Sequence, residues 1–275
     1  MEEQKIKIGY STLTRKIREL GLREVPKERS DKAVVYPSEE MQHDTSPFIV
    51  QIGNAKKKVQ ASLLYFRYSK IRYLKFYYSF NRFNMKCFLD EALKSIGHSC
   101  KICVIDNTNL AVYRGTGKNA IINSEMLEFS KPFGFKWLAH KINHSDRKAG
   151  VERGFRTIGT NFFSGRTFTS LEDLNEQAFS WCKKKNTTPN KKTKIIPAEV
   201  FEEEKKYTDK VNPAQPSPYI SSHRTIDQYG YISFESNYYW LPKGTSGTAT
   251  IIRYSNADCV LTFILSSLPN CLNFF

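Results

Sequence analysis

The order of strand-like and helix-like segments is the feature that most constrains the fold of this chain. Three consecutive segments rich in aromatic and β-branched residues predict strands at 40–46, 58–65 and 71–78. Helices and strands then alternate, and we expect helices at 83–96, 123–129, 147–162 and 171–182 and strands at 101–106 and 136–139. Because consecutive strands form hairpins and strands joined through helices run parallel, this order predicts a mixed five-stranded sheet flanked by helices.

That arrangement is typical of the ribonuclease-H-like fold, which belongs to the α/β class. The first strand of such a sheet lies beside the fourth, so residues that are distant in sequence become neighbours. Asp44 falls in the first expected strand, and Asp106 falls at the end of the fourth. We therefore expect these two carboxylates to lie close together at one edge of the sheet.

A third acid, Glu152, falls on the expected helix 147–162 among basic residues. Three carboxylates that meet at one point need a cation, and Mg²⁺ prefers oxygen ligands of this kind, with Mn²⁺ able to substitute. Two such ions about 4 Å apart can activate a nucleophile and stabilise the leaving oxygen of a phosphodiester. Asp44, Asp106 and Glu152 are therefore predicted as metal ligands and catalytic residues.

Each of these acids also has a purely structural interpretation. Asp44 could cap a turn formed with Thr45 and Ser46, and Asp106 could simply end its strand in a turn. Glu152 lies one helical turn from a lysine and an arginine, so it could be a solvated ion-pair partner. Further acids that could approach the site are Glu40 and Glu125, and we expect both at the surface.

The net charge of the chain points to a polyanionic partner. It is +15 over 275 residues, and so large an excess repels itself unless a partner such as nucleic acid offsets it. No uncharged apolar stretch approaches the roughly 18 residues of a membrane span, and the first residues lack the apolar run of a signal peptide. We therefore expect a cytoplasmic protein without a membrane partner.

The six cysteines show no regular disulfide spacing, which favours a reducing compartment. Cys100 and Cys103 form a lone C-x-x-C beside His98. A zinc site would need a second pair at a suitable distance, so we expect buried structural thiols in a strand.

Residues 1–38 resemble the end of a helix-turn-helix region followed by a charged linker. We expect a helix at 9–22 whose apolar stripe holds Leu13, Ile17 and Leu20 and whose other face offers Arg15 and Arg18 to DNA. The alternative is an ordinary amphipathic helix. Only eight residues precede it, so we expect this region to be a remnant of a DNA-binding region.

Beyond the expected core at 39–182, the composition changes. Residues 183–222 are predicted to be a basic connector in which Lys183, Lys184 and Lys185 follow a phosphate backbone. Short strand-like segments punctuated by glycine and asparagine predict a small β-barrel at 223–265. Residues 266–275 are expected to be an atypical tail.

Three segments carry a resemblance to a known family. They are Glu40-Met41-Gln42-His43-Asp44-Thr45-Ser46-Pro47, Cys103-Val104-Ile105-Asp106-Asn107-Thr108-Asn109 and Arg147-Lys148-Ala149-Gly150-Val151-Glu152-Arg153. In these motifs and in its strand order the chain resembles DDE transposases with a retroviral-integrase-like catalytic core. Among these it is most similar to the transposases of two-gene bacterial insertion sequences that travel with an AAA+ ATPase helper.

The resemblance implies Mg²⁺-dependent DNA strand cleavage and strand transfer, with Asp44, Asp106 and Glu152 as the catalytic triad. It also implies double-stranded DNA as partner (transposon ends and target), a homo-oligomer, an AAA+ ATPase helper and association with the bacterial nucleoid. Candidate DNA contacts around the triad are Asn107, Lys148, Arg153 and Arg156, although a turn or a solvated helix face would also explain these residues.

Two other functions fit the same residues. The chain could be a catalytically silent DNA-binding remnant of a transposase. It could also be another nuclease of the ribonuclease-H-like fold, such as a ribonuclease H or a junction resolvase, and those enzymes usually carry a fourth acid near the site.

Overall fold

The computed structural model describes residues 9–22, 35–140, 154–190, 193–234, 236–242, 245–253, 261–265 and 271–274. The chain divides into two compact units, Met1–Val35 and Tyr36–Phe275. The first unit contains α1 (Tyr10–Glu19), which lies within the helix predicted at 9–22. Of the predicted apolar stripe, Leu13 on α1 and Leu20 just after its end are exposed.

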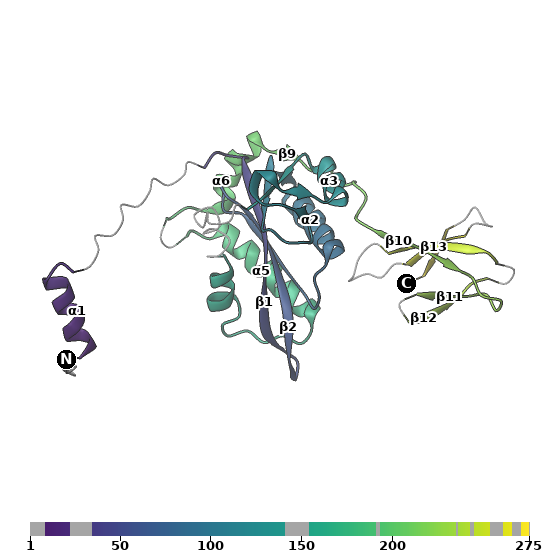
Figure 1. The fold of residues 1–275 in the computed structure, drawn as a ribbon, viewed down its shortest axis with the longest axis horizontal. Helices are drawn as coiled ribbons and strands as arrows, with labels where there is room; N and C mark the ends of the chain where they lie inside the picture. Colours follow the sequence, from purple (N-terminus) through teal and green to yellow (C-terminus); the bar gives the residue numbers. More distant parts are fainter. Residues whose placement is uncertain are drawn as a thin grey trace, which may run out of the picture. The chain divides into compact units, whose positions relative to one another are not determined.

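The centre of the second unit is a five-stranded sheet (Figure 1). Its strands are β1 (Glu40–Ile52), β2 (Ala55–Phe66), β3 (Arg72–Tyr77), β5 (Ile102–Ile105) and β8 (Lys136–Ala139), in the order β3-β2-β1-β5-β8. The first three strands pair antiparallel, whereas β1, β5 and β8 run parallel. The mixed sheet and ribonuclease-H-like strand order predicted from the sequence are confirmed.

The β1–β2 hairpin is longer than predicted. We expected the first strand to end at Ser46 and the second to begin at 58, but pairing continues to Ile52 and Ala55. A two-residue turn joins the strands, and its Gly53 has φ of 55°, a conformation typical of tight hairpin turns. Pro47 is tolerated because β1 pairs with β5 only as far as Gln42, which leaves its outer half with one partner strand among the described residues.

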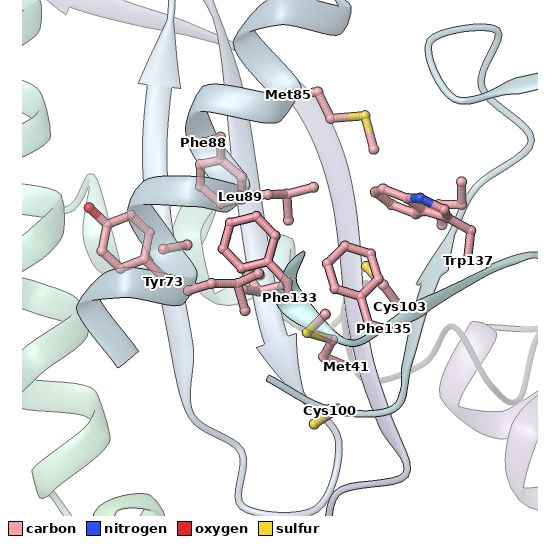
Figure 2. Packing of buried hydrophobic residues seen from close by; sticks show 14 of the residues in the cluster. Met41, Tyr73, Met85, Phe88, Leu89, Cys100, Cys103, Phe133, Phe135 and Trp137 are labelled. Carbon is pink, nitrogen blue, oxygen red and sulfur yellow. The ribbon is translucent and has the colours of Figure 1, made fainter. Parts of the chain in front are cut away.

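Helices cover both faces of the sheet. One face packs against α2 (Arg82–Ile96) and α3 (Ser124–Ser130), and Figure 2 shows the core between them. Asn81 caps the start of α2, and Gly97 ends it in the left-handed conformation. The other face packs against α5 (Leu171–Thr187) and a helical segment at 154–162. The last five residues of that segment, Ile158–Phe162, form a π-helical turn.

Several short elements complete this unit. They are β4 (His98–Ser99) paired with β9 (Asp209–Lys210), β6 (Val112–Arg114) paired with β7 (Ile121–Ile122), α6 (Pro197–Glu204), and the 3₁₀ turns Gly117–Asn119, Lys131–Phe133 and Lys205–Tyr207. The predicted connector at 183–222 thus includes the end of α5, all of α6 and β9. In α6, the buried Glu204 accepts backbone hydrogen bonds from Ser38 (3.1 Å) and Ser69 (3.2 Å) and so fastens this helix to the core.

The C-terminal part is rich in strands, as predicted. β10 (Ile220–Thr225), β13 (Thr248–Arg253), β14 (Leu261–Leu265) and β15 (Cys271–Phe274) form an antiparallel sheet, and β11 (Tyr231–Phe234) pairs with β12 (Asn237–Trp240). A small apolar cluster that includes Ile232, Leu241 and Ile251 stabilises them. β15 lies within the tail at 266–275, and closure of these strands into a barrel stays a prediction.

Within the described part of the chain, no helix combines the length and the apolar character that crossing a membrane requires.

Candidate active site

The sheet brings Asp44 and Asp106 onto neighbouring strands. In the parallel β1–β5 pair, Gln42 lies opposite Val104, so continuing this register by two residues places Asp44 opposite Asp106. Adjacent strands are about 4.8 Å apart, so the two residues are neighbours. The expectation that these acids come together from distant parts of the sequence therefore fits the observed topology.

Both side chains lie on the same face of the sheet. Side chains alternate along a strand, so Asp44 shares its face with Val50 and Ile52, which belong to the core under α5 and the segment 154–162. Cys103 and Ile105 of β5 belong to the opposite core, which leaves Asp106 on the face of Asp44. Because strand alternation places both acids on this face, a helix packed on the same face can bring a third ligand to them.

The two carboxylates differ in exposure and in their local contacts. Asp44 is half-buried, and its Oδ1 accepts a hydrogen bond from the Thr45 backbone N–H at 2.8 Å. Asp106 is exposed, and its Oδ1 accepts one from the Asn107 N–H at 3.0 Å. The Asn107 side chain donates to the His140 carbonyl at 2.8 Å, so it ties the turn after β5 to the end of β8. Asn107 thus takes part in this turn, and its contact with DNA stays a prediction.

Glu152, Lys148 and Arg153 lie outside the described residues, but the chain immediately after them packs on the Asp44 face. An ideal Cβ at Gly154 would lie 2.7 Å from Leu63 Cδ2, and Leu63 is the β2 partner of Asp44. Next along the helix, the ring centroid of Phe155 is 6.5 Å from that of Phe48, which shares the Asp44 face. The segment that follows Glu152 therefore approaches the sheet beside Asp44.

The residues of this face suit a hard divalent cation, because carboxylate oxygens are the ligands that Mg²⁺ prefers. Among the described residues, no group of three or more histidine, cysteine, aspartate or glutamate side chains is placed to hold a metal. Asp44 and Asp106 are two of the three predicted ligands, and the third, Glu152, lies in the range 141–153 outside the described residues.

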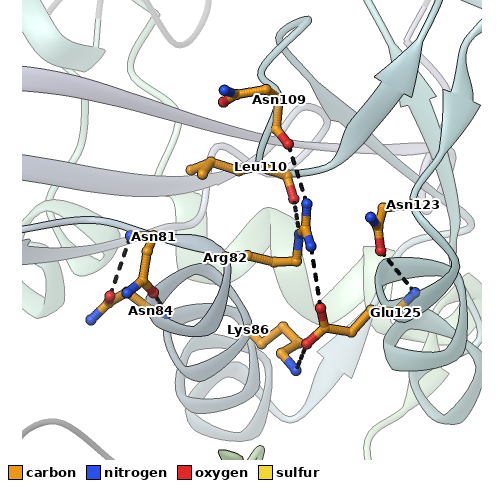
Figure 3. Close-up of polar contacts among 8 residues, drawn as sticks. All are labelled: Asn81, Arg82, Asn84, Lys86, Asn109, Leu110, Asn123 and Glu125. Atoms are coloured by element: carbon orange, nitrogen blue, oxygen red, sulfur yellow. Dashed lines mark hydrogen bonds and ion pairs between the residues drawn. The ribbon is translucent and has the colours of Figure 1, made fainter.

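Neither of the other candidate acids is available as a fourth ligand. Glu40 is buried rather than at the surface as expected, because it pairs with Arg67 at 3.1 Å and accepts a hydrogen bond from Gln42. Glu125 is exposed as expected and forms ion pairs with Arg82 (3.4 Å) and Lys86 (Figure 3). Partial burial would raise the pKa of Glu125, but hydrogen bonds with Lys86 and Arg82 outweigh it and lower this pKa.

Arg82 is a residue near the site that the sequence analysis missed. Its Nε donates to the Leu110 carbonyl at 2.7 Å and its Nη2 to the Asn109 carbonyl at 3.4 Å, so it holds the loop that follows Asp106 (Figure 3). Its partners are distant in sequence, and no local pattern marks them. The Lys56–Lys58 run lies exposed on β2 of the hairpin, where the sequence had not singled it out.

The predicted basic contacts are spread over several elements. Arg156 is exposed on the segment 154–162. Lys183 and Lys184 are exposed on α5, although the Lys183 ammonium also lies 4.4 Å from the Phe179 ring centroid. Arg15 of α1 is exposed and lies 3.7 Å from Glu19, while Lys185 lies 5.8 Å from the Trp181 ring. The side chain of Arg18 lies outside the description.

Buried titratable groups on the opposite face serve packing. His43 contacts Phe88, with ring centroids 5.3 Å apart, and its Nε2 lies 2.8 Å from Ser62 Oγ. Burial lowers the pKa of His43 to about 3, so the ring is neutral. Cys100 and Cys103 are buried free thiols, as predicted, and burial raises the pKa of both.

Comparison with known proteins adds sequence evidence. No protein-family model matches the chain. A putative transposase for insertion sequence element IS5376 from Geobacillus stearothermophilus is 26% identical over 235 residues, which cover 82% of this chain and 57% of that protein. The chain thus spans little more than half the length of this relative.

Two solved structures have lower similarity. The simian T-cell lymphotropic virus intasome in complex with PP2A regulatory subunit B56 gamma has a TM-score of 0.44 and 11% identity, covering 89% of this chain and 82% of its own. The HTLV-2 integrase catalytic core domain in complex with magnesium has a TM-score of 0.42 and 13% identity, covering 60% and 96%. By sequence, the chain is similar to an insertion-sequence transposase over most of its length, and this confirms the resemblance predicted from its motifs.

Proposed function

We propose that this chain is a transposase that cleaves DNA strands and transfers them to a target with Mg²⁺ as cofactor. The observation that carries the proposal is the pair Asp44 and Asp106 on adjacent strands, facing the side on which the segment after Glu152 packs. The sequence similarity to an insertion-sequence transposase supports the same reaction class.

In this proposal Asp44, Asp106 and Glu152 hold the metal. Bound Mg²⁺ would supply charge neutralisation at the phosphate and activation of the attacking oxygen. Asn107 keeps the turn at Asp106 attached to β8 through the His140 carbonyl, and so fixes the direction of one carboxylate. Arg82 holds the next residues of the same loop, while the exposed Arg156 offers positive charge to the phosphate backbone.

The partners in this proposal are double-stranded DNA, as transposon ends and target, and further copies of the chain. The net charge of +15 supports a polyanionic partner. The AAA+ ATPase helper implied by the resemblance remains a prediction, as does nucleoid association.

A catalytically silent DNA-binding remnant of a transposase stays an alternative, and it differs from the proposal in lacking metal-dependent cleavage. A ribonuclease H or resolvase is less favoured. Glu40 is paired with Arg67, and Glu125 is paired with Arg82 and Lys86, so neither adds the fourth acid of such a site.

Nicking of supercoiled plasmid tests the proposal. The purified chain should nick in Mg²⁺ or Mn²⁺ and not in EDTA, and Asp106→Asn should bind DNA equally well without nicking. Asp90→Asn, an aspartate on α2 that pairs with Lys94, is the matched control and should nick like the unmodified chain. Equal DNA binding by all three proteins without nicking would favour the silent remnant.

A further inference from the structure

A groove lies at the outer half of the β1–β2 hairpin, on the sheet face opposite the two carboxylates. Its volume is about 430 Å³, which is within the range of ligand sites. It is lined by the hairpin, the loop that follows β3 and the loop that follows Asp106. Thr45 faces it, because side chains alternate and Asp44 points to the other side. We call this feature the hairpin groove.

The hairpin groove exists because the hairpin extends past the helices that cover this face. Among the described residues, α2 and α3 pack over the inner half of the face, near Met41 and Cys103. Further out, Ile49 is 76% exposed, and Lys56 and Lys58 are exposed on the same face. The exposed lysines of this surface are accessible to an anionic partner.

The groove's side chains match the chemistry of an unpaired nucleic-acid strand. Lys58 lines it and Lys56 lies beside it, and the hairpin between 45 and 62 carries three lysines without an acidic residue. Gln60 and Asn109 offer amides that can reach base edges. Tyr78 is 53% exposed and offers an aromatic surface for stacking. Sites for single-stranded nucleic acid usually combine cationic side chains, which follow the phosphate backbone, with aromatic side chains on which the bases stack.

One wall of the groove is already fixed. Leu110 lines it, and the Leu110 carbonyl accepts the hydrogen bond from Arg82 Nε at 2.7 Å (Figure 3). Arg82 is in turn paired with Glu125 at 3.4 Å, so helices α2 and α3 both hold this loop. A wall that is ordered before binding lowers the entropy lost when a strand enters.

We propose that the hairpin groove binds an unpaired strand of DNA on the sheet face opposite the catalytic carboxylates. The choice of DNA rests on the proposed function, while the preference for a single strand rests on the groove itself. Thr45 follows Asp44 directly, and Thr108 lies two residues after Asp106, so both lining residues adjoin the site. The groove and the two carboxylates therefore lie on opposite faces of the same part of the sheet.

Fluorescence anisotropy with a labelled oligothymidylate and with a duplex of equal length tests this inference. Lys56→Glu/Lys58→Glu should weaken single-strand binding about tenfold or more, and Tyr78→Ala about fivefold or more. The matched control is Lys101→Glu/Lys136→Glu, which makes the same charge change at exposed lysines at the starts of β5 and β8. The control should bind the single strand at least three times more tightly than the groove double variant.

Two results would overturn the inference. One is single-strand binding by both groove variants at the affinity of the control. The other is a change of oligomeric state in size-exclusion chromatography without a change in affinity, which would assign the surface to a second copy of the chain. Unfolding curves check that each variant folds. Asp106→Asn should keep full single-strand binding, so a failure to nick plasmid and a failure of the groove are separate results.

Discussion

Gly154 lies directly against Leu63, the residue that pairs with Asp44 across the β1–β2 hairpin. A Cβ at Gly154 would approach Leu63 Cδ2 to 2.7 Å, closer than real Cβ contacts, so a larger residue must push the helical segment or the leucine away. This contact sets how near the chain that follows Glu152 comes to the carboxylate face.

Gly154→Ala should therefore lower the free energy of unfolding by about 1–3 kcal/mol, as overpacking does, and should reduce nicking by moving the segment after Glu152. Urea unfolding and the plasmid assay measure both effects. Gly159→Ala is the control, because its added Cβ meets only Phe48 at an ordinary 3.8 Å. Adding Leu63→Val to Gly154→Ala should restore part of the lost activity. Equal stability of the two alanine variants would contradict this account.

The buried carboxylate of Glu204 should contribute to the free energy of unfolding. Its two carboxylate oxygens accept the backbone N–H groups of Ser38 and Ser69, and its side chain is fully buried. Glu204→Gln replaces one acceptor by a donor that faces another N–H, which should cost about 1–3 kcal/mol. Glu203→Gln, an exposed neighbour paired with Lys206 at 2.6 Å, should change the free energy of unfolding by less than about 1 kcal/mol. Urea unfolding compares them, and a similar loss in both would contradict the proposed role of Glu204.

The strand order of the core was predictable because hydrophobic patterning and helix caps are local in sequence. Gly97 ends α2 as expected, and the apolar segment before Asp106 became a buried parallel strand. Once that order is known, the meeting of Asp44 and Asp106 follows from topology. This is why two carboxylates that are distant in sequence could be expected on neighbouring strands.

Other features depended on tertiary contacts that no local pattern reveals. The outer half of the hairpin was missed because Pro47 and the lysines at 56–58 are unusual in strands, and pairing across the Gly53 turn overrides that preference. The burial of Glu40 could not be anticipated because its partner Arg67, which lies opposite it just after β2, is 27 residues away in sequence. The groove likewise needs the hairpin and two separate loops to come together.

The burial of His43 should make the free energy of unfolding depend on pH. Burial holds the pKa of its ring at about 3 in the folded chain, below its ordinary value of 6.5. The unfolded chain therefore binds a proton that the folded chain does not, and stability falls as the pH falls from 6.5 towards 3. This component amounts to about 2 kcal/mol between pH 6.5 and pH 5.

His43→Gln removes that component. Urea unfolding at pH 7 and pH 5 should show a smaller difference between the two pH values for the variant than for the unmodified chain, whatever the variant loses at pH 7. Identical pH differences in the two proteins would show that His43 is not the group responsible.

Arg82 should act on activity more than on stability. Arg82→Lys keeps the charge beside Glu125 but loses the planar fork that reaches the Leu110 and Asn109 carbonyls. We expect nicking to fall several-fold while the free energy of unfolding changes by about 1 kcal/mol or less. Arg114→Lys, a change at an exposed arginine of β6, should leave nicking unchanged. Full activity in Arg82→Lys would remove the argument that this loop must be held.

The central claim is that Asp106 is a metal ligand in a DNA-cleaving site, and a change of metal preference tests it most directly. A thiolate in place of the carboxylate binds Mg²⁺ poorly but accepts the softer Mn²⁺ better. Plasmid nicking by Asp106→Cys should therefore be lost in Mg²⁺ and recovered at least in part in Mn²⁺, while the unmodified chain nicks in both. Nicking by Asp106→Cys in Mg²⁺ at the rate of the unmodified chain would contradict the claim.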